Sequence, residues 1–179
     1  ITTYLEAGCG FGGSCFPKDV RALISHGRNS GTSMQLLEAV MDVNERQPFR
    51  LIEMLGKHFP AFEKVTVGIL GLSFKPGTDD VRESPAIAII QDLISRGATI
   101  KTYDPAAMET ARKILGNQHI TYCGTLKEAV SNVDAICLVT RWEEFNQLPA
   151  LLTSNGKPPI VVDGRRMLDR SSLVGYEGI

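Results

Sequence analysis

The sequence lacks the residue patterns of a metal site and of a membrane protein. Its three histidines are far apart, and none of its four cysteines form a C-x-x-C pair. The ligand spacing of a zinc site is therefore missing, and we expect no bound metal. No apolar run approaches the ~20 residues of a membrane-spanning helix, and no charged and apolar leader opens the chain. We therefore expect a cytoplasmic protein with no membrane partner and reduced thiols, although a long-range disulfide stays open on sequence alone.

The sequence also has little excess charge. Its formal net charge is -1 over 179 residues, of which 43% are hydrophobic and 22% charged. This balance gives no electrostatic reason to bind nucleic acid. The length suits one full domain and part of another. The chain opens on Ile1-Thr2-Thr3-Tyr4, without an initiator methionine, which we interpret as a fragment of a longer protein.

The most informative stretch is a run of glycines that ends in a thiol, Gly8-Cys9-Gly10-Phe11-Gly12-Gly13-Ser14-Cys15-Phe16-Pro17-Lys18-Asp19. Glycine lets the backbone approach a ligand closely and adopt positive φ. Cys15 precedes a predicted helix start and lies near Lys18, a setting that favours a thiolate. The stretch therefore predicts a nucleophilic cysteine beside a bound anion. The alternative is a small buried hydrophobe, which is our interpretation of Cys123 and Cys137, in or beside predicted strands.

The first third of the chain is predicted to be helical after this glycine-rich loop. A short helix is expected over residues 19–25, with Gly27 ending it. Apolar residues then recur at helical spacing over residues 34–59, where Pro48 should bend or divide the helix. Such a helix suits a connector and a homodimer interface, with a core helix as the alternative.

From residue 62 onward, strands and helices alternate. Strands are expected over residues 65–71, 98–103, 119–122, 134–140 and 159–163. Ser84-Pro85 and Thr125 are predicted to begin helices, since they match N-cap and first-turn preferences. The alternation predicts an α/β fold with a Rossmann-like, doubly wound parallel sheet over residues 62–179, preceded by a helical segment, residues 1–61.

Ligands of such a sheet bind beyond the carboxyl ends of its strands. The loop after the first strand carries Lys75 and Arg82 near a helix N-terminus, which suits phosphate; a solvated loop with local ion pairs is the alternative. This loop lacks the G-x-G-x-x-G dinucleotide fingerprint. Gly8 to Gly13 matches that pattern, but no apolar strand precedes it, so we interpret the match as coincidence.

Three further positions follow predicted strands. Asp104 lies where nucleotide-binding sheets often place a ribose-binding acid. Trp142 could stack on a base, although packing is favoured. Arg165 and Arg166 could bind phosphate or sugar oxygens, with an ion pair to Asp163 or Asp169 favoured as the alternative.

Four motifs together resemble one family. They are residues 10–19 quoted above, Gly71-Leu72-Ser73-Phe74-Lys75-Pro76-Gly77-Thr78-Asp79-Asp80-Val81-Arg82-Glu83-Ser84-Pro85, Tyr103-Asp104-Pro105 and Asp163-Gly164-Arg165-Arg166. In this order they resemble the UDP-glucose/GDP-mannose dehydrogenase family over essentially the whole chain. The resemblance implies that residues 1–61 are the end of a central helical and dimerisation domain. Residues 62–179 would be the C-terminal domain that binds UDP-sugar.

The resemblance implies oxidation of the C6 alcohol of a nucleotide sugar to a carboxylate with two NAD⁺. Cys15 would capture the aldehyde and become a thioester, and Asp19 would position or activate the water that cleaves it. Lys18 and Arg82 would contact NAD phosphates, and Arg165 would reach the substrate of a neighbouring subunit. The remaining substrate-binding residues implied are Tyr4, Leu5, Glu6, Ala7, Gly8, Phe11, Gly12, Phe74 and Lys75.

Two departures from the family pattern stand out. Cys9 has no expected role, and the family's N-terminal NAD-binding unit does not appear in the sequence. We therefore expect the chain alone to be inactive. UDP-glucose is the favoured sugar nucleotide, with GDP-mannose and UDP-N-acetylhexosamines left open. The alternatives of another class are a stand-alone nucleotide-sugar-binding module and an interaction module that dimerises through the long helix.

Overall fold

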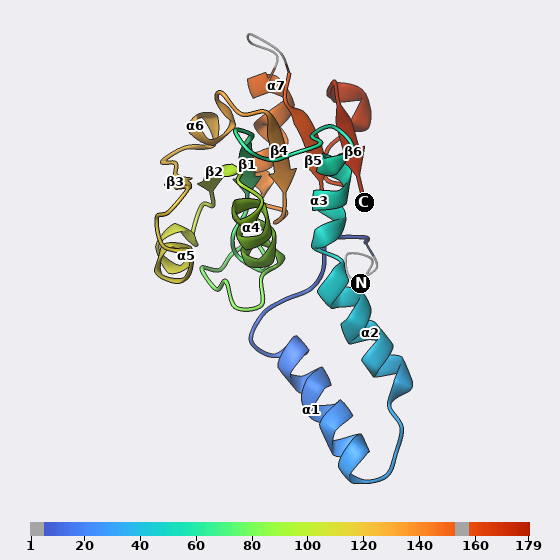
Figure 1. The fold of residues 1–179 in the computed structure, drawn as a ribbon. Coiled ribbons are helices and arrows are strands. Elements are labelled where there is room, and N and C mark those ends of the chain that lie inside the picture. Colours follow the sequence, from blue (N-terminus) through green and yellow to red (C-terminus); the bar gives the residue numbers. More distant parts are fainter. Residues whose placement is uncertain (1–5, 153–157) are drawn as a thin grey trace.

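The computed structural model describes residues 6–152 and 158–179. Within them a parallel sheet has the strand order β3-β2-β1-β4-β5-β6, and a helical hairpin projects from the body (Figure 1). The strands are β1 (Thr66–Leu70), β2 (Thr99–Tyr103), β3 (Ile120–Tyr122), β4 (Ala135–Leu138), β5 (Ile160–Asp163) and β6 (Tyr176–Gly178). The helices are α1 (Phe16–Asn29), α2 (Gln35–Arg46), α3 (Phe49–Gly56), α4 (Pro85–Ser95), α5 (Met108–Leu115), α6 (Leu126–Val130) and α7 (Leu148–Leu152), with short 3₁₀ turns η2 (Glu143–Gln147) and η3 (Arg170–Ser172).

The sheet confirms the predicted doubly wound architecture. Its central strand β1 pairs with β2 on one side, Ile69 opposite Thr102, and with β4 on the other, Ile69 opposite Cys137. Strand order therefore reverses at β1. In doubly wound sheets, this reversal opens a crevice at the carboxyl ends of the strands.

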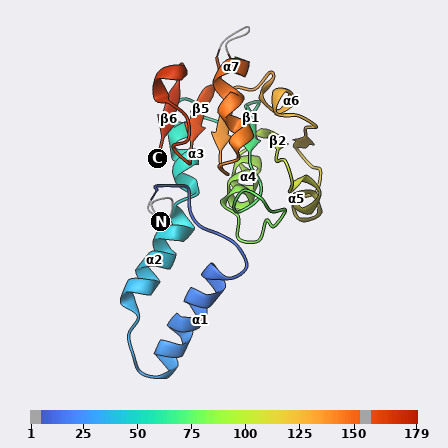
Figure 2. The ribbon, with the colours of Figure 1, turned by 180° about the vertical axis from the view of Figure 1, so that it is seen from behind.

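Apolar side chains cover both faces of the sheet. One buried cluster joins β1 to α3 and α4, through residues such as Leu51, Leu55 and Ile89. A second cluster joins the opposite face to α6 and α7, around Phe145 and Leu148. The two views in Figures 1 and 2 show these helices on opposite sides of the sheet. The helix α3 thus shares its core with the sheet although it follows the hairpin in the chain.

Local signals in the sequence place most element ends. The Ser84 hydroxyl accepts a hydrogen bond from Ala86 N at the start of α4, and Pro85 is the first residue of that helix. The Thr125 hydroxyl likewise caps α6 by accepting from Glu128 N. Gly116 ends α5 with a φ of 71°, a conformation that favours glycine. The two predicted helix starts, at Ser84-Pro85 and at Thr125, are confirmed.

The first helix is present as predicted, but its predicted ends were wrong. The helix α1 begins at Phe16 and continues to Asn29, whereas the sequence predicted residues 19–25, with Gly27 ending the helix. Gly27 lies inside the helix, where an added Cβ would come within 2.6 Å of Met34 Cγ. This glycine therefore allows the chain leading into α2 to pack closely, and it does not terminate the helix.

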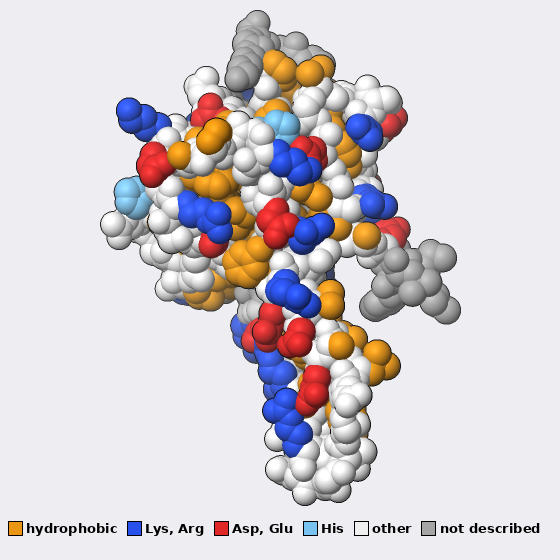
Figure 3. All heavy atoms as spheres, turned by 45° about the vertical axis from the view of Figure 1, so that its right-hand side comes forward, with side chains coloured by type: hydrophobic (Ala, Val, Ile, Leu, Met, Phe, Trp, Pro, Cys, Tyr) orange, Lys and Arg blue, Asp and Glu red, His pale blue; other side chains and the backbone are white. Residues whose placement is uncertain are grey.

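The long helix is divided as predicted. Residues 34–59 contain α2 and α3, separated at Gln47 and Pro48. On α2 the side chains of Leu36, Val40 and Val43 are exposed, at spacings of four and three residues. Such spacing places them on one helix face, and Figure 3 shows hydrophobic side chains gathered along one side of the hairpin.

One strand was missed. Residues 159–163 were expected to be the last strand, but β6 adds parallel to β5, with Val162 opposite Glu177. Its three residues are only partly buried and carry no apolar run. Its place is decided by backbone pairing with β5, which a hydrophobicity pattern does not reveal.

Candidate active site

The Gly-rich segment, defined as residues 8–15, crosses the carboxyl edge of the sheet. Its backbone is held at two points: Cys9 N donates to Gly164 O after β5 at 3.0 Å, and Gly13 N donates to Arg82 O at 2.9 Å. Arg82 belongs to the β1–α4 loop, defined as residues 71–84. The segment therefore joins the ends of two strands that the sequence places far apart.

Two glycines make this approach possible. An added Cβ on Gly12 would lie 2.2 Å from Glu83 O, and one on Gly13 would lie 2.8 Å from the Phe74 ring. Gly13 also has a φ of +95°, which L side chains rarely adopt. Lys75 Nζ stands 5.3 Å from the Phe74 ring centroid. The structure thus brings together Gly12, Phe74 and Lys75, which the sequence predicts as substrate-binding residues.

Cys15 follows this contact and precedes the first turn of α1. The residue is exposed, its Sγ lies 3.6 Å from Ser14 Oγ, and its carbonyl accepts from Asp19 N at 2.8 Å. The thiol therefore faces solvent at a helix N-terminus, where the backbone N–H groups favour a nearby anion. This is the position predicted for a nucleophile.

Arg82 lies near Cys15, since its carbonyl accepts from Gly13 N, two residues before the thiol. The hydrogen bond to Asp80 is the main reason that the pKa of Arg82 is above its ordinary value, and the charge of Cys15 adds a smaller increase. Arg82 Nη2 lies 2.7 Å from Asp80 Oδ2, with the Arg82 side chain still 66% exposed. An exposed cation beside the thiol is compatible with a phosphate ligand. Arg82 also forms, with Asp80, the kind of local ion pair that the alternative interpretation of this loop expects.

Lys18 and Asp19 occupy the exposed side of the first turn of α1. Lys18 Nζ lies 3.4 Å from Asp19 Oδ1, and their side chains are 71% and 66% exposed. Within the described residues, neither side chain forms a hydrogen bond or ion pair with the sheet domain. Their expected roles in NAD binding and water activation stay predictions.

The beginning of the Gly-rich segment is held by two arginines. Glu6 forms an ion pair with Arg141. Arg165 donates through Nε to Val139 O at 2.5 Å and through Nη2 to Gly10 O at 3.3 Å. An added Cβ on Gly8 would approach Arg165 Nη1 within 2.7 Å. Tyr4 and Leu5 lie outside the described residues, and Ala7 is exposed.

Arg165 lies against the Gly-rich segment of its own chain through the bonds given above. Its expected contact with the substrate of a neighbouring subunit stays a prediction. The expected ion pair with Asp163 is replaced by backbone bonds. Asp163 Oδ1 accepts from Arg165 N at 2.9 Å, and Oδ2 accepts from Met167 N and Leu168 N. Asp163 thereby shapes the turn, while the arginine side chain holds the segment.

Asp104 is a structural residue, contrary to the ribose-binding interpretation. It is 1% exposed. Its Oδ2 accepts from Leu72 N at 2.7 Å and Ser73 N at 3.0 Å, and its Oδ1 accepts from Ala106 N and Ala107 N at 2.8 Å. These bonds, with those described next, occupy both oxygens. Asp104 therefore fixes the start of the β1–α4 loop that carries Phe74.

Trp142 supports the same centre. Its Nε1 donates to Asp104 Oδ2 at 3.1 Å and to Ser73 Oγ at 3.3 Å. The indole is partly buried and packs against the second core cluster. The favoured interpretation, packing rather than base stacking, agrees with this placement.

Cys9 and α2 contribute residues that the sequence reasoning missed. Cys9 is fully buried, and burial raises the pKa of its thiol, so it anchors the segment as a core residue. Asn44 binds both backbone groups of Phe11, and Gln47 Nε2 donates to Gly8 O at 3.0 Å. The sequence signal that could have found Asn44 and Gln47 is the presence of polar residues on the partly buried side of a helix.

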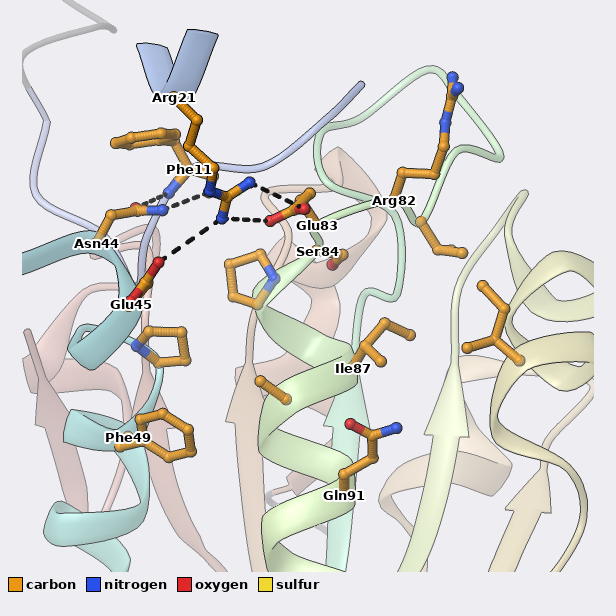
Figure 4. Close-up of a pocket in the computed structure, with 15 residues that line it drawn as sticks. Phe11, Arg21, Asn44, Glu45, Phe49, Arg82, Glu83, Ser84, Ile87 and Gln91 are labelled. Carbon is orange, nitrogen blue, oxygen red and sulfur yellow. Dashed lines mark hydrogen bonds and ion pairs between the residues drawn. The ribbon is translucent and has the colours of Figure 1, made fainter. Parts of the chain in front are cut away.

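A hollow of about 430 Å³ lies next to this site, between α2, α3 and α4. Figure 4 shows Arg21 between Glu83 and Glu45 at its upper rim, and Arg82 directed away from that ion pair. Arg21 Nη2 lies 3.2 Å from Glu83 Oε2 and 3.7 Å from Glu45 Oε1. The lining includes Phe11 but neither Cys15 nor Lys75. Two predicted site residues, Phe11 and Arg82, thus line the hollow, whereas Cys15 does not.

Residues 6–152 and 158–179 lack two other kinds of feature. These residues contain no cluster of three His, Cys, Asp or Glu side chains suited to a metal ion. Nor does any helix among them combine the length and apolar composition needed to span a bilayer.

Comparisons with known proteins identify a family for the chain. Residues 68–170 match the model of the UDP-glucose/GDP-mannose dehydrogenase family, UDP binding domain, and residues 1–46 match that family's central domain. The UDP-glucose 6-dehydrogenase of Haloferax volcanii is 42% identical over 178 residues, which are 99% of this chain and 40% of that protein. The UDP-glucose 6-dehydrogenase TuaD of Bacillus subtilis is 38% identical, over 97% of this chain and 38% of that protein.

Solved structures give the same result. A UDP-glucose dehydrogenase from Pyrobaculum islandicum is 38% identical with a TM-score of 0.88, over 98% of this chain and 39% of that one. A GDP-mannose dehydrogenase is 30% identical with a TM-score of 0.81, over 98% of this chain and 41% of that one. The chain thus spans about 40% of the length of these relatives. By these matches, the chain belongs to the UDP-glucose/GDP-mannose dehydrogenase family.

Proposed function

We propose that the chain is the C-terminal part of an NAD-dependent nucleotide-sugar 6-dehydrogenase and that UDP-glucose is its substrate. One observation carries the proposal: the Gly-rich segment packs against Phe74, next to Lys75, and leads directly to the exposed thiol of Cys15. A nucleotide sugar at this sheet edge would have its hexose near a nucleophile. The relatives named UDP-glucose 6-dehydrogenase favour the glucose nucleotide over GDP-mannose and UDP-N-acetylhexosamines.

The described residues do not form a complete NAD site. The Gly8–Gly13 stretch packs against the β1–α4 loop and does not follow a strand within the described residues. Lys18 and Arg82 are exposed cations that fit contacts to NAD phosphates, while the dinucleotide cradle would come from outside this chain. When bound, NAD⁺ would accept one hydride from C6 in each of the two oxidations.

Cys15 would carry the covalent chemistry between the two oxidations. Its thiolate sulfur would attack the C6 aldehyde carbon, forming a C–S bond while the carbonyl oxygen takes up a proton. The second oxidation converts this thiohemiacetal into a thioester. Water, positioned by Asp19, then adds to the thioester carbon and expels the thiolate, giving the carboxylate. Covalent capture divides the oxidation and retains the aldehyde.

The experiment is turnover by the full-length protein that contains this chain. We expect UDP-glucuronate and two NADH per product from the wild type. Cys15→Ser should lose product formation by more than about a thousandfold, as for loss of a nucleophile. Cys123→Ala is the thiol-matched control, since Cys123 is buried in the second core cluster, and it should retain turnover.

Two results would contradict this function. Unchanged turnover in Cys15→Ser would remove the nucleophile, and NADH production by the isolated 179-residue chain would show a complete NAD site in it. Calorimetry of the isolated chain with UDP and with NAD separates the enzyme part from a stand-alone module, since a module would bind UDP without any requirement for Cys15. Rates with the three sugar nucleotides decide the substrate.

The exposed apolar stripe supports homodimerisation through α2 and α3. Leu36 is 77% exposed and Val43 54% exposed on a hairpin that projects from the body. Burying such a face excludes apolar surface from water. Leu36→Glu with Val43→Glu should convert a dimer to a monomer in light scattering, whereas a monomeric wild type would contradict the proposal.

We also propose a reducing, cytoplasmic location. All four cysteines are free thiols, which suits a reducing compartment. Cell fractionation with an antibody against the chain would test the location.

A further inference from the structure

Asn44 grips the backbone of the Gly-rich segment from α2. Its Oδ1 accepts from Phe11 N at 2.8 Å, and its Nδ2 donates to Phe11 O at 3.1 Å. One side chain thus satisfies both backbone groups of a residue four positions before Cys15. Gln47, one helical turn later, donates to Gly8 O at 3.0 Å.

The segment needs such support because it has few restraints of its own. Gly10 and Gly13 have φ values of 112° and 95°, and glycine loses more conformational freedom on ordering than other residues. Among the described residues, its only bonds to other backbone groups before Cys15 are those of Cys9 and Gly13. The interval between them is held by the side chains of Asn44 and Arg165.

Aromatic packing connects Phe11, whose backbone Asn44 holds, to the residue next to Cys15. The ring of Phe11 meets the ring of Phe16 edge to face, with centroids 4.8 Å apart. Phe16 is the first residue of α1 and the neighbour of Cys15. Fixing the Phe11 backbone therefore fixes the start of the helix that presents the thiol.

The structure assigns Asn44, assisted by Gln47, the role of a positioning residue that holds the Cys15 thiol where it captures the aldehyde. The assignment rests on the proposed function. Asn44 lies in the last turn of α2, and Gln47 is the residue that directly follows this helix, before Pro48. The helix that joins the hairpin to the sheet domain thereby also sets the place of the nucleophile.

The first test is turnover by the full-length protein. Asn44→Ala should lower kcat by about a hundredfold, the scale expected for a misplaced reacting group, with KM for UDP-glucose changed by less than about threefold. Asn44→Asp keeps the acceptor for Phe11 N but loses the donor to Phe11 O, so its loss should be smaller. Asn29→Ala and Gln35→Ala alter exposed residues of the same types on α1 and α2 and should leave kcat unchanged.

A second readout separates positioning from folding. If the thiol is misplaced, aldehyde from the first oxidation escapes capture and is trapped by hydroxylamine. The trapped fraction should rise at least about tenfold in Asn44→Ala and in Gln47→Ala, since capture competes with escape. Simple loss of folded enzyme would lower both oxidations equally and leave this fraction unchanged.

Hydrogen exchange of the 179-residue chain tests the grip without turnover. The Phe11 amide should exchange at least about tenfold faster in Asn44→Ala than in Asn29→Ala, because its acceptor is gone. If the wild type oxidises no nucleotide sugar, the proposed function fails, and this exchange still decides whether Asn44 holds the segment. The assignment is overturned by an unchanged trapped fraction in both variants, or by unchanged Phe11 exchange. If Asn44→Ala does not fold, the trapped fraction in Asn44→Asp and Gln47→Ala carries the decision, because Asn44→Asp keeps the acceptor of Phe11 N and its exchange is not informative.

Discussion

Replacing Gly12 by alanine tests how closely the thiol-bearing segment must approach the β1–α4 loop. A Cβ at Gly12 would lie 2.2 Å from Glu83 O and 2.8 Å from Glu83 C, whereas ordinary contact begins at 3.4 Å. The obstacle is backbone, which cannot rotate away as a flexible side chain does. Either the segment or the loop must therefore move.

The magnitude follows from two opposing effects. Alanine reduces the freedom of the unfolded chain and by itself stabilises by about 0.4–1 kcal/mol. Overpacking at a tight site costs about 1–3 kcal/mol, and a shift large enough to break Gly13 N–Arg82 O loses about 1 kcal/mol more. We expect Gly12→Ala to destabilise the chain by about 1–3 kcal/mol.

Gly56→Ala is the matched control. Gly56 is the last residue of α3, and nothing lies within 4 Å of its added Cβ. Alanine is the better helix former, so this variant should be unchanged or more stable by up to about 1 kcal/mol. Urea unfolding followed by circular dichroism compares the two variants with the wild type at equal m value. If Gly12→Ala is as stable as Gly56→Ala, the close approach does not constrain the segment.

Three further predictions concern the sheet domain. Asp104→Ala should destabilise the chain by about 3 kcal/mol or more, since it leaves several buried donors such as Leu72 N unpaired. Urea unfolding measures this loss of unfolding free energy, and a loss below about 1 kcal/mol would favour the ribose-binding interpretation of Asp104. Burial is the main cause that raises the pKa of Tyr176 to about 12, and the charge of Asp163 is the next. The stability that this hydroxyl contributes is therefore complete below its unfolded pKa of about 10 and is lost as pH rises toward the folded value. Tyr176→Phe should remove that decline, and an unchanged profile of unfolding free energy from pH 9 upward would contradict it. A hydrogen bond from Lys57 is the main cause that lowers the pKa of Glu177. The stability that Glu177 contributes is therefore present above its unfolded pKa of about 4.3 and is lost as pH falls. Glu177→Gln should reduce the loss of unfolding free energy at acid pH, and an unchanged loss would refute this.

Much of the sheet could be predicted from local sequence. The strand over residues 66–70 is an apolar run, and Ser84-Pro85 and Thr125 carry their own capping signals. These features depend on neighbours within a few residues, so the local sequence specifies them. The extent of α1 and the strand β6 could not be predicted in this way, because packing against Met34 and pairing with β5 decided them.

The sequence by itself determined which residues we propose to carry chemistry: a thiol after a run of glycines, with cations after a strand. Only the tertiary structure decided how they are used. Both carboxylate oxygens of Asp104 accept hydrogen bonds from backbone N–H groups. The Arg165 guanidinium donates to backbone oxygens of its own chain. Asn44, more than thirty residues from Phe11 in the chain, became the residue that holds the thiol-bearing segment. The physical reason is that a hydrogen bond between distant residues exists only after the chain has folded, so its partners carry no local pattern.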